Sequence, residues 1–313
     1  MKGLDLARQY YEAWGKEMLQ TQFPHVLPYL AIGLAGSGSE CYGYDDETSQ
    51  DHDFEPAFCI FLPGEGVVDR RTAFLLERAY AKLPKEFLGL TRSPVSPVGG
   101  SRHGVIRMEE FFSAKTGRPD GELSPEQWFA LPEYGLLEAT NGEVFSDPYG
   151  QFTAIREKLR FFPEDIRRKK LAGYLLLMGQ SGQYNYGRCV ARGETAAAQL
   201  AVFEFTQSAL HVIYLLNRAY MPYYKWCFRG LRGLPILSTL AEDLEHLIST
   251  GNTAVEASRK AARIEQICAA VADELRAQGL TDLQNAEMEQ QAYALNNTVT
   301  DHNIRNLHIL HGV

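Results

Sequence analysis

The sequence predicts an α+β protein in which a mixed sheet with flanking helices is followed by an all-helical bundle domain. Short apolar runs bounded by glycine or proline predict buried strands at 29–35, 57–62 and, with weaker alternation, 104–109. Near Ser124 the pattern changes. A proline at the first helical position and a glutamine at the third mark a helix start, and helical periodicity then continues almost to the end of the chain.

The helices of the first half follow from periodicity. Apolar residues at helical spacing predict helices over 3–19 and 67–83. Residues 39–46 are expected to form a short helix whose first turn faces a phosphate, with Asp45 and Asp46 solvated; the alternative for this acidic pair is a metal-binding role.

A long loop is predicted at residues 89–104, which are rich in glycine, proline and serine. Long loops in compact domains are often functional. Arg92, Arg102 and His103 of this loop could approach a substrate, and the alternative is an exposed basic loop.

The turn-rich segment 142–150 predicts the domain boundary. We therefore divide the chain into a sheet-containing domain over 1–145 and a helical domain over 146–313. The helices predicted from there onward are 152–161, 163–182, 194–219, 234–250, 252–279 and 283–300.

The composition narrows the classes of function that the protein could have. A net charge of −8 argues against broad nucleic-acid binding, which needs a basic surface. The five cysteines are odd in number and form no CxxC pair, so we expect neither a disulfide framework nor a structural zinc site, and a reducing cytoplasm fits best. The N-terminus lacks the apolar core of a signal peptide, and no run reaches about 18 apolar residues, so we expect no membrane span.

The stretch from Gly36 to Pro63 carries the main candidate site. A Gly/Ser turn leads to Asp51 and Asp53, which directly precede the apolar strand. Side chains at positions i and i+2 of a strand project to the same side, so we expect the two carboxylates to lie together. Adjacent carboxylates repel each other unless a cation joins them, and proteins hold Mg²⁺ with one or two carboxylates plus phosphate oxygens. Because glycines let backbone N–H groups approach a phosphate, the pattern predicts a Mg²⁺–phosphate site; the alternative is a solvated acidic loop.

These residues also resemble a known superfamily. GSECYG at 38–43, followed by DHD at 51–53, resembles the GSxxxG…DxD signature of the nucleotidyltransferases, which include DNA polymerase beta, the aminoglycoside nucleotidyltransferases and the antitoxin-type nucleotidyltransferases. The longer string GSGSECYGYDDETSQDHDF, with LNRAYMPYYKW further on, is similar to an uncharacterised bacterial family that joins a nucleotidyltransferase domain to a helical domain. The resemblance covers most of the chain and implies a nucleotidyltransferase-like fold for the first domain.

The resemblance implies roles for the residues of the signature. Gly38 and Ser39 would hold the β- and γ-phosphates of a nucleoside triphosphate (NTP). Asp51 and Asp53 would bind one or two Mg²⁺ ions, which clamp the transferring phosphorus and lower the pKa of the attacking hydroxyl. Catalysis of this kind is largely positioning and charge stabilisation.

The superfamily often adds a third carboxylate from a later strand, and Glu109 is the candidate by position. Residues 109–112 are equally typical of a helix start, so both interpretations stay open. The catalytic base could be Glu109 or, from the helical domain, Glu194, and the sequence does not choose between them.

Two polar clusters of the helical half contain candidate phosphate-binding cations. Arg188 ends the segment QYNYGR, and Lys225 lies in the aromatic segment LNRAYMPYYKW. Either cation could offset the charge of a phosphate as pyrophosphate leaves. The alternative is helix–helix packing, in which the tyrosine hydroxyls bond to neighbouring groups.

These observations predict a Mg²⁺-dependent nucleotidyltransferase that moves a nucleoside monophosphate from an NTP to a hydroxyl of a small-molecule or protein acceptor and releases pyrophosphate. The helical domain favours a small polar acceptor by analogy of fold. The alternatives are a catalytically inactive nucleotide-binding or partner-binding protein of the same fold, and a protein that AMPylates itself or a partner. The sequence identifies neither the acceptor, nor the nucleotide, nor the oligomeric state.

Overall fold

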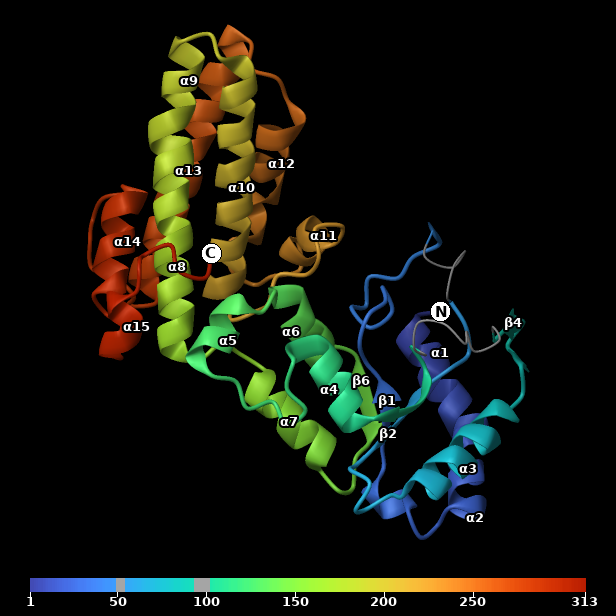
Figure 1. The fold of residues 1–313 in the computed structure, drawn as a ribbon. Helices are drawn as coiled ribbons and strands as arrows, with labels where there is room; N and C mark the ends of the chain where they lie inside the picture. Colours follow the sequence, from blue (N-terminus) through green and yellow to red (C-terminus); the bar gives the residue numbers. More distant parts are fainter. Residues whose placement is uncertain (49–53, 93–101) are drawn as a thin grey trace. The chain divides into compact units, whose positions relative to one another are not determined.

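The computed structural model describes residues 1–48, 54–92 and 102–313, and the chain forms two compact units (Figure 1). The first unit comprises Met1–Leu123 and Pro132–Arg160, and the second comprises Ser124–Leu131 and Phe161–Val313. The predicted boundary near residue 145 lies inside the first unit, because the strand and the helix on either side of it pack into that unit.

The core of the first unit is a mixed sheet, which confirms the α+β class. Among the described residues it has four strands in the order β5-β2-β1-β6, with β1 antiparallel to β2 and β6 and β2 parallel to β5. The apolar runs predict three of these strands, whereas the half-buried β6 lies in a segment that predicts a connector. The strand bounds are β1 (Ala31–Leu34), β2 (Cys59–Leu62), β5 (Gly104–Arg107) and β6 (Glu143–Ser146).

The register of the sheet brings three loops together at one end of its strands. Cys59, at the start of β2, pairs with Gly33 of β1 on one side and with Gly104 of β5 on the other. The loop that leaves β1 and the loops that enter β2 and β5 therefore meet at the same end of the sheet.

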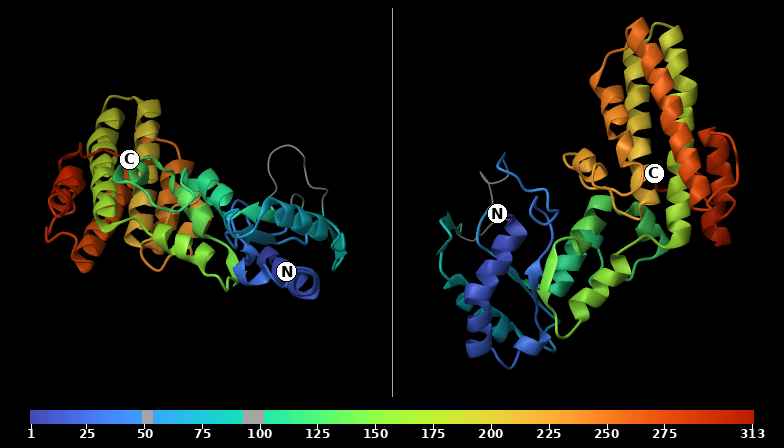
Figure 2. Two further views of the ribbon diagram at one scale, coloured as in Figure 1. Left: turned by 60° about the horizontal axis from the view of Figure 1, so that its bottom comes forward. Right: turned by 180° about the vertical axis from the view of Figure 1, so that it is seen from behind.

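Helices cover both faces of this sheet, and Figures 1 and 2 show α1 and α3 on one side and α4, α6 and α7 on the other. Alternation along β2 explains the division: Ile60 and Leu62 join the core with α1–α3, whereas the Phe61 ring lies 5.1 Å from Phe111 and 4.1 Å from Phe152. The helix bounds are α1 (Gly3–Tyr10), η1 (Tyr11–Gly15), α2 (Lys16–Gln22), η2 (Leu27–Tyr29), α3 (Arg70–Ala81), α4 (Met108–Thr116), α6 (Glu133–Thr140) and α7 (Gln151–Leu159). A small hairpin of β3 (Glu86–Phe87) and β4 (Leu90–Thr91) follows α3.

The helices predicted over 3–19 and 67–83 are confirmed, but the helix predicted over 39–46 is wrong, because residues 39–43 form turns and residues 44–46 have no regular secondary structure. Asp45 is also buried, not solvated, with 3% of its surface exposed. Its carboxylate accepts the backbone N–H of Gly3 at 2.9 Å and lies 3.4 Å from the Lys2 ammonium. Asp45 thus ties the turn segment to the start of α1, where a helix N-terminus favours a negative charge.

The second unit contains helices joined by turns and loops, and no strand among its described residues. Elements α8, η4 and α9 form one continuous helix, which packs along α10. Helix α14 packs on α8. The capping box predicted at Ser124 is present, since its hydroxyl accepts the Gln127 N–H and the Gln127 side chain accepts the Ser124 N–H. The helix bounds are α5 (Pro125–Ala130), α8 (Glu164–Met178), η4 (Gly179–Tyr186), α9 (Gly187–Ala191), α10 (Thr195–Leu216), α11 (Cys227–Leu231), η5 (Ser238–Leu240), α12 (Ala241–Ser249), α13 (Ala254–Ala277), α14 (Met288–Asn296) and α15 (His302–Asn306).

None of the helices in the described part of the chain combines the length and the apolarity that a membrane span requires.

Three arginines converge on Glu164 at the start of α8. Arg167 and Arg168 each donate to its carboxylate at 2.9 Å, and Arg218 donates to it at 2.9 Å. Arg167 is itself buried and also donates to the carbonyl oxygen of Leu215 in α10. Burial of Glu164 by itself raises its pKa, but the arginine hydrogen bonds and charges outweigh burial and lower the pKa to about 2.

The second unit is therefore expected to lose stability as the pH falls from about 4.5 towards about 2, because the unfolded chain binds a proton at Glu164 in that window while the folded chain does not. Glu164→Gln should flatten this dependence and lower the free energy of unfolding at pH 7 by about 1–2 kcal/mol, after allowance for partial solvent screening. Urea unfolding at pH 7 and pH 3 measures both effects. Glu245→Gln, which removes an exposed pair with Arg232, is the control. An unchanged pH dependence in the Glu164 variant would contradict the assignment.

Candidate functional site

The loop that leaves β1 is a tight glycine turn. Gly36 and Gly38 have φ values of +118° and +132°, a region that favours glycine. The side chain of Asn141 clamps the turn from the end of α6: it accepts the Gly36 N–H and donates to the Gly36 carbonyl oxygen, both at 2.9 Å. The sequence indicates only that Asn141 ends a helix, because its partner lies 105 positions away.

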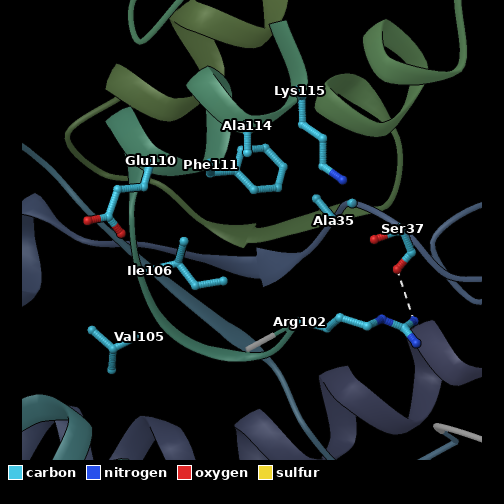
Figure 3. Close-up of a pocket in the computed structure, with 10 residues that line it drawn as sticks. Ala35, Ser37, Arg102, Val105, Ile106, Glu110, Phe111, Ala114 and Lys115 are labelled. Carbon is cyan, nitrogen blue, oxygen red and sulfur yellow. Dashed lines mark hydrogen bonds between the residues drawn. The ribbon is translucent and has the colours of Figure 1, made fainter. Parts of the chain in front are cut away.

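A cavity of about 360 Å³ opens beside this turn, between β5 and α4. In Figure 3, Phe111 and Ile106 face the cavity, and the charged side chains of Arg102, Glu110 and Lys115 stand around it. The volume suits a small ligand, and an apolar floor with a few charged groups is typical of a binding site. The cavity is lined by Ala35, Gly36, Ser37, Arg102, Val105, Ile106, Glu110, Phe111, Ala114 and Lys115.

Arg102 links the cavity to the glycine turn. One of its guanidinium nitrogens, Nη2, donates to the carbonyl oxygen of Ser37 at 2.9 Å and to Glu40 Oε1 at 2.6 Å. The sequence places Arg102 in a loop that could approach a substrate, and the structure places it at the cavity. Its neighbour His103 lies 3.1 Å from the carboxylate of Glu55 through Nδ1.

Lys115 is the second cation of the cavity, and it too is paired. Its ammonium binds the carboxylate of Glu138 in α6, and that carboxylate also accepts the Tyr42 hydroxyl at 3.1 Å. Burial, followed by the nearby charge of Glu138, raises the pKa of Tyr42, so its hydroxyl stays a donor at neutral pH. This network joins the segment after the glycine turn to α4 and α6.

The two cysteines next to the turn do not supply a nucleophile. Burial raises the pKa of the Cys59 thiol to about 12 and holds the pKa of Cys41 well above its usual value. A thiol reacts as the thiolate, so both groups are inert at neutral pH.

The predicted site residues of the first unit have different outcomes. Gly38 and Ser39 lie in the turn that adjoins the cavity, whereas Asp51 and Asp53 lie outside the described residues, and their pairing stays a prediction. Glu109 is exposed in the first turn of α4, so the structure agrees with the interpretation of residues 109–112 as a helix start. The next residue, Glu110, lines the cavity. The described residues hold no cluster of three His, Cys, Asp or Glu side chains able to bind a metal.

The candidates in the second unit are exposed. Glu194 is the residue before α10, where its side chain makes no capping hydrogen bond. The Arg188 guanidinium lies over the Tyr184 ring at 4.8 Å, and the Lys225 ammonium lies over the Trp226 ring at 5.0 Å. These three residues belong to a different compact unit from the cavity.

Packing accounts for much of the segment that contains Arg188. Gln183 donates to Glu265 and to the carbonyl oxygen of Ala286, at 2.9 and 3.0 Å. Tyr186 is buried and donates to Asn252 at 3.0 Å. The packing interpretation of these two side chains therefore agrees with the structure.

Replacing Gly38 with alanine is expected to weaken binding of Mg²⁺–tripolyphosphate at this turn about tenfold or more. A Cβ at position 38 would collide with Arg102 Nη2 and with the Glu40 carboxylate, and the backbone there disfavours any side chain. Isothermal titration calorimetry measures the change.

Gly43→Ala is the matched control for this variant. Gly43 also has a positive φ, +71°, but a Cβ there would meet no atom within 4 Å. It should lose about 1 kcal/mol of stability without losing affinity. Equal affinities of the Gly38 variant and the unmodified protein would show that binding does not use the geometry of the turn.

Comparison with known proteins matches one family model to this chain. Residues 128–227 match a domain of unknown function, DUF4037. The match runs from α5 to the start of α11 and includes Arg188, Glu194 and Lys225, whereas the glycine turn and the cavity residues precede it. No curated protein matches the chain.

Proposed function

We propose that the chain is a Mg²⁺-dependent nucleotidyltransferase that transfers a nucleoside monophosphate from an NTP to a hydroxyl of a small-molecule or protein acceptor. The observation that supports it most is the glycine turn beside the 360 Å³ cavity, because Arg102 supplies a positive charge at the point where the two meet. One end of the sheet brings together the glycine turn, residues 54–58 that lead into β2, and the start of β5.

In the proposed reaction the acceptor oxygen forms a bond to the α-phosphorus, and the bond from that phosphorus to the bridging oxygen of pyrophosphate breaks. The bond electrons leave with pyrophosphate, and the acceptor proton passes to a base. Asp51 and Asp53 are the proposed Mg²⁺ ligands, and the metal offsets the charge that develops on the phosphate oxygens. Gly38 and Ser39 are the proposed contacts to the β- and γ-phosphates, because glycine lets backbone N–H groups come close to a phosphate.

Thermal shift with ATP, GTP, CTP and UTP, with and without Mg²⁺, tests the binding step. A nucleotide at 100 times its dissociation constant should stabilise the protein by about 2.7 kcal/mol. Pyrophosphate release, measured in parallel, tests transfer, and a gain in intact mass with ATP identifies self-AMPylation. Tight binding without pyrophosphate release would instead identify a nucleotide-binding protein without transferase activity. A protein that binds none of the four nucleotides does not have the proposed function.

A further inference from the structure

We propose that Arg102 is the phosphate-binding cation of the glycine turn and that Glu40 holds it in a ligand-free arrangement, so that an incoming triphosphate must take Arg102 from Glu40. The proposal rests on the proposed function, since it assigns a residue pair to the same site. It makes Arg102 a contact to the ligand and Glu40 a residue that controls access to it.

The contacts place Arg102 between the turn and the cavity. Its guanidinium donates to the Ser37 carbonyl oxygen at 2.9 Å and to Glu40 Oε1 at 2.6 Å, and its side chain also lines the cavity. A guanidinium has five N–H donors, so it can keep the bond to Ser37 and exchange the carboxylate for a phosphate oxygen. Lys115, the other cation of the cavity, has no such contact to the turn among the described residues, because its partner is Glu138.

The ion pair lies directly against the backbone of Gly38. Any Cβ at this position would collide with the Arg102 guanidinium and with the Glu40 carboxylate. The pair therefore occupies the space beside Gly38 that a phosphate bound at this glycine would need.

Glu40 is the group that is destabilised when Arg102 exchanges its carboxylate for a phosphate. Its side chain is 11% exposed, against 33% for Arg102, and Arg102 is its hydrogen-bond partner within the described part of the chain. A mostly buried carboxylate that loses its cation is destabilised, and a phosphate nearby adds repulsion between like charges. Glu40 thus competes with the ligand, and the fraction of molecules in which Arg102 has left Glu40 limits the apparent affinity.

The test is calorimetric binding of tripolyphosphate with Mg²⁺, and of the four NTPs, at fixed ionic strength. Arg102→Gln should weaken binding about 10- to 100-fold, because it removes charge-assisted hydrogen bonds to the ligand. Glu40→Gln should tighten binding about threefold to tenfold, because it removes the carboxylate that competes with the phosphate for Arg102. Both variants break the same ion pair, so both should lower the thermal midpoint of the protein.

The opposite signs of the two affinity changes separate this mechanism from a structural role, which would weaken binding in both variants. Glu65→Gln removes an ion pair with Arg70 outside the cavity and should leave the affinity unchanged. Arg102→Lys keeps the charge and is the variant to use if Arg102→Gln does not fold; it should weaken binding about threefold to tenfold, because it loses the fork of the guanidinium.

Unchanged or weaker binding by Glu40→Gln, or unchanged binding by either Arg102 variant, would overturn the proposal while leaving the proposed function intact. If the unmodified protein binds neither tripolyphosphate nor any of the four NTPs, both fall together.

Discussion

Asp51→Asn and Asp53→Asn are each expected to lower the rate of pyrophosphate release at least about a hundredfold while leaving the protein folded. An asparagine has nearly the shape of an aspartate but lacks the negative charge that binds Mg²⁺, so the metal and the charge compensation at phosphorus are lost together. Pyrophosphate release measured at saturating NTP and Mg²⁺ reports the rate, and circular dichroism reports the fold.

Glu47→Gln is the control for these two variants, since it removes a charge from the same acidic segment at an exposed position. It should retain the full rate. If both aspartate variants retained activity as well, the chemistry would not depend on the predicted metal ligands, and the nucleotidyltransferase proposal would be wrong.

Lys169→Met is expected to destabilise the second unit by about 2–4 kcal/mol. Lys169 is fully buried in α8, and burial lowers its pKa. Its ammonium donates to the Asn296 side chain at 2.8 Å and to the carbonyl oxygens of Arg305 and Leu307, at 3.0 and 2.7 Å. All three N–H donors are therefore used, and methionine would leave three partly buried oxygens without this donor.

Urea unfolding measures this loss, and Lys158→Met provides the comparison. Lys158 pairs with the carboxylate of Glu122 on the surface of the first unit. Removal of the Lys158 ammonium should therefore change stability by about 0.5 kcal/mol or less. A similar small change for Lys169→Met would mean that the three hydrogen bonds of its ammonium contribute little to the stability of the second unit.

Local patterns predicted much of this fold. The apolar runs located β1, β2 and β5, and helical periodicity located α1–α2, α3, α8, α10 and α13, because the repeat of side chains along a strand or helix is a property of neighbouring residues. The same reasoning failed at 39–46, where no helix forms, because Asp45 instead pairs with Lys2 and Gly3 more than 40 positions earlier.

Among the candidate residues of the first unit, Gly38 lies in the turn and Arg102 lines the cavity, whereas Glu109 does not line it. Glu109 was the candidate because it ends the strand predicted over 104–109, but the helix begins at Met108, and the next residue, Glu110, is the one that lines the cavity. No periodicity argument resolves a difference of one residue where a strand passes directly into a helix.

By itself, the sequence determined that a region with short buried strands precedes a helical region and that a glycine turn follows the first strand, because periodicity and the backbone freedom of glycine act over a few residues. Only the tertiary structure decided what surrounds that turn. Arg102 and Glu40 are 62 positions apart, Lys115 and Glu138 are 23 apart, and Asn141 and Gly36 are 105 apart. Such contacts form only after the register of the sheet has brought separate loops together at one end of its strands. No local pattern in the chain encodes them.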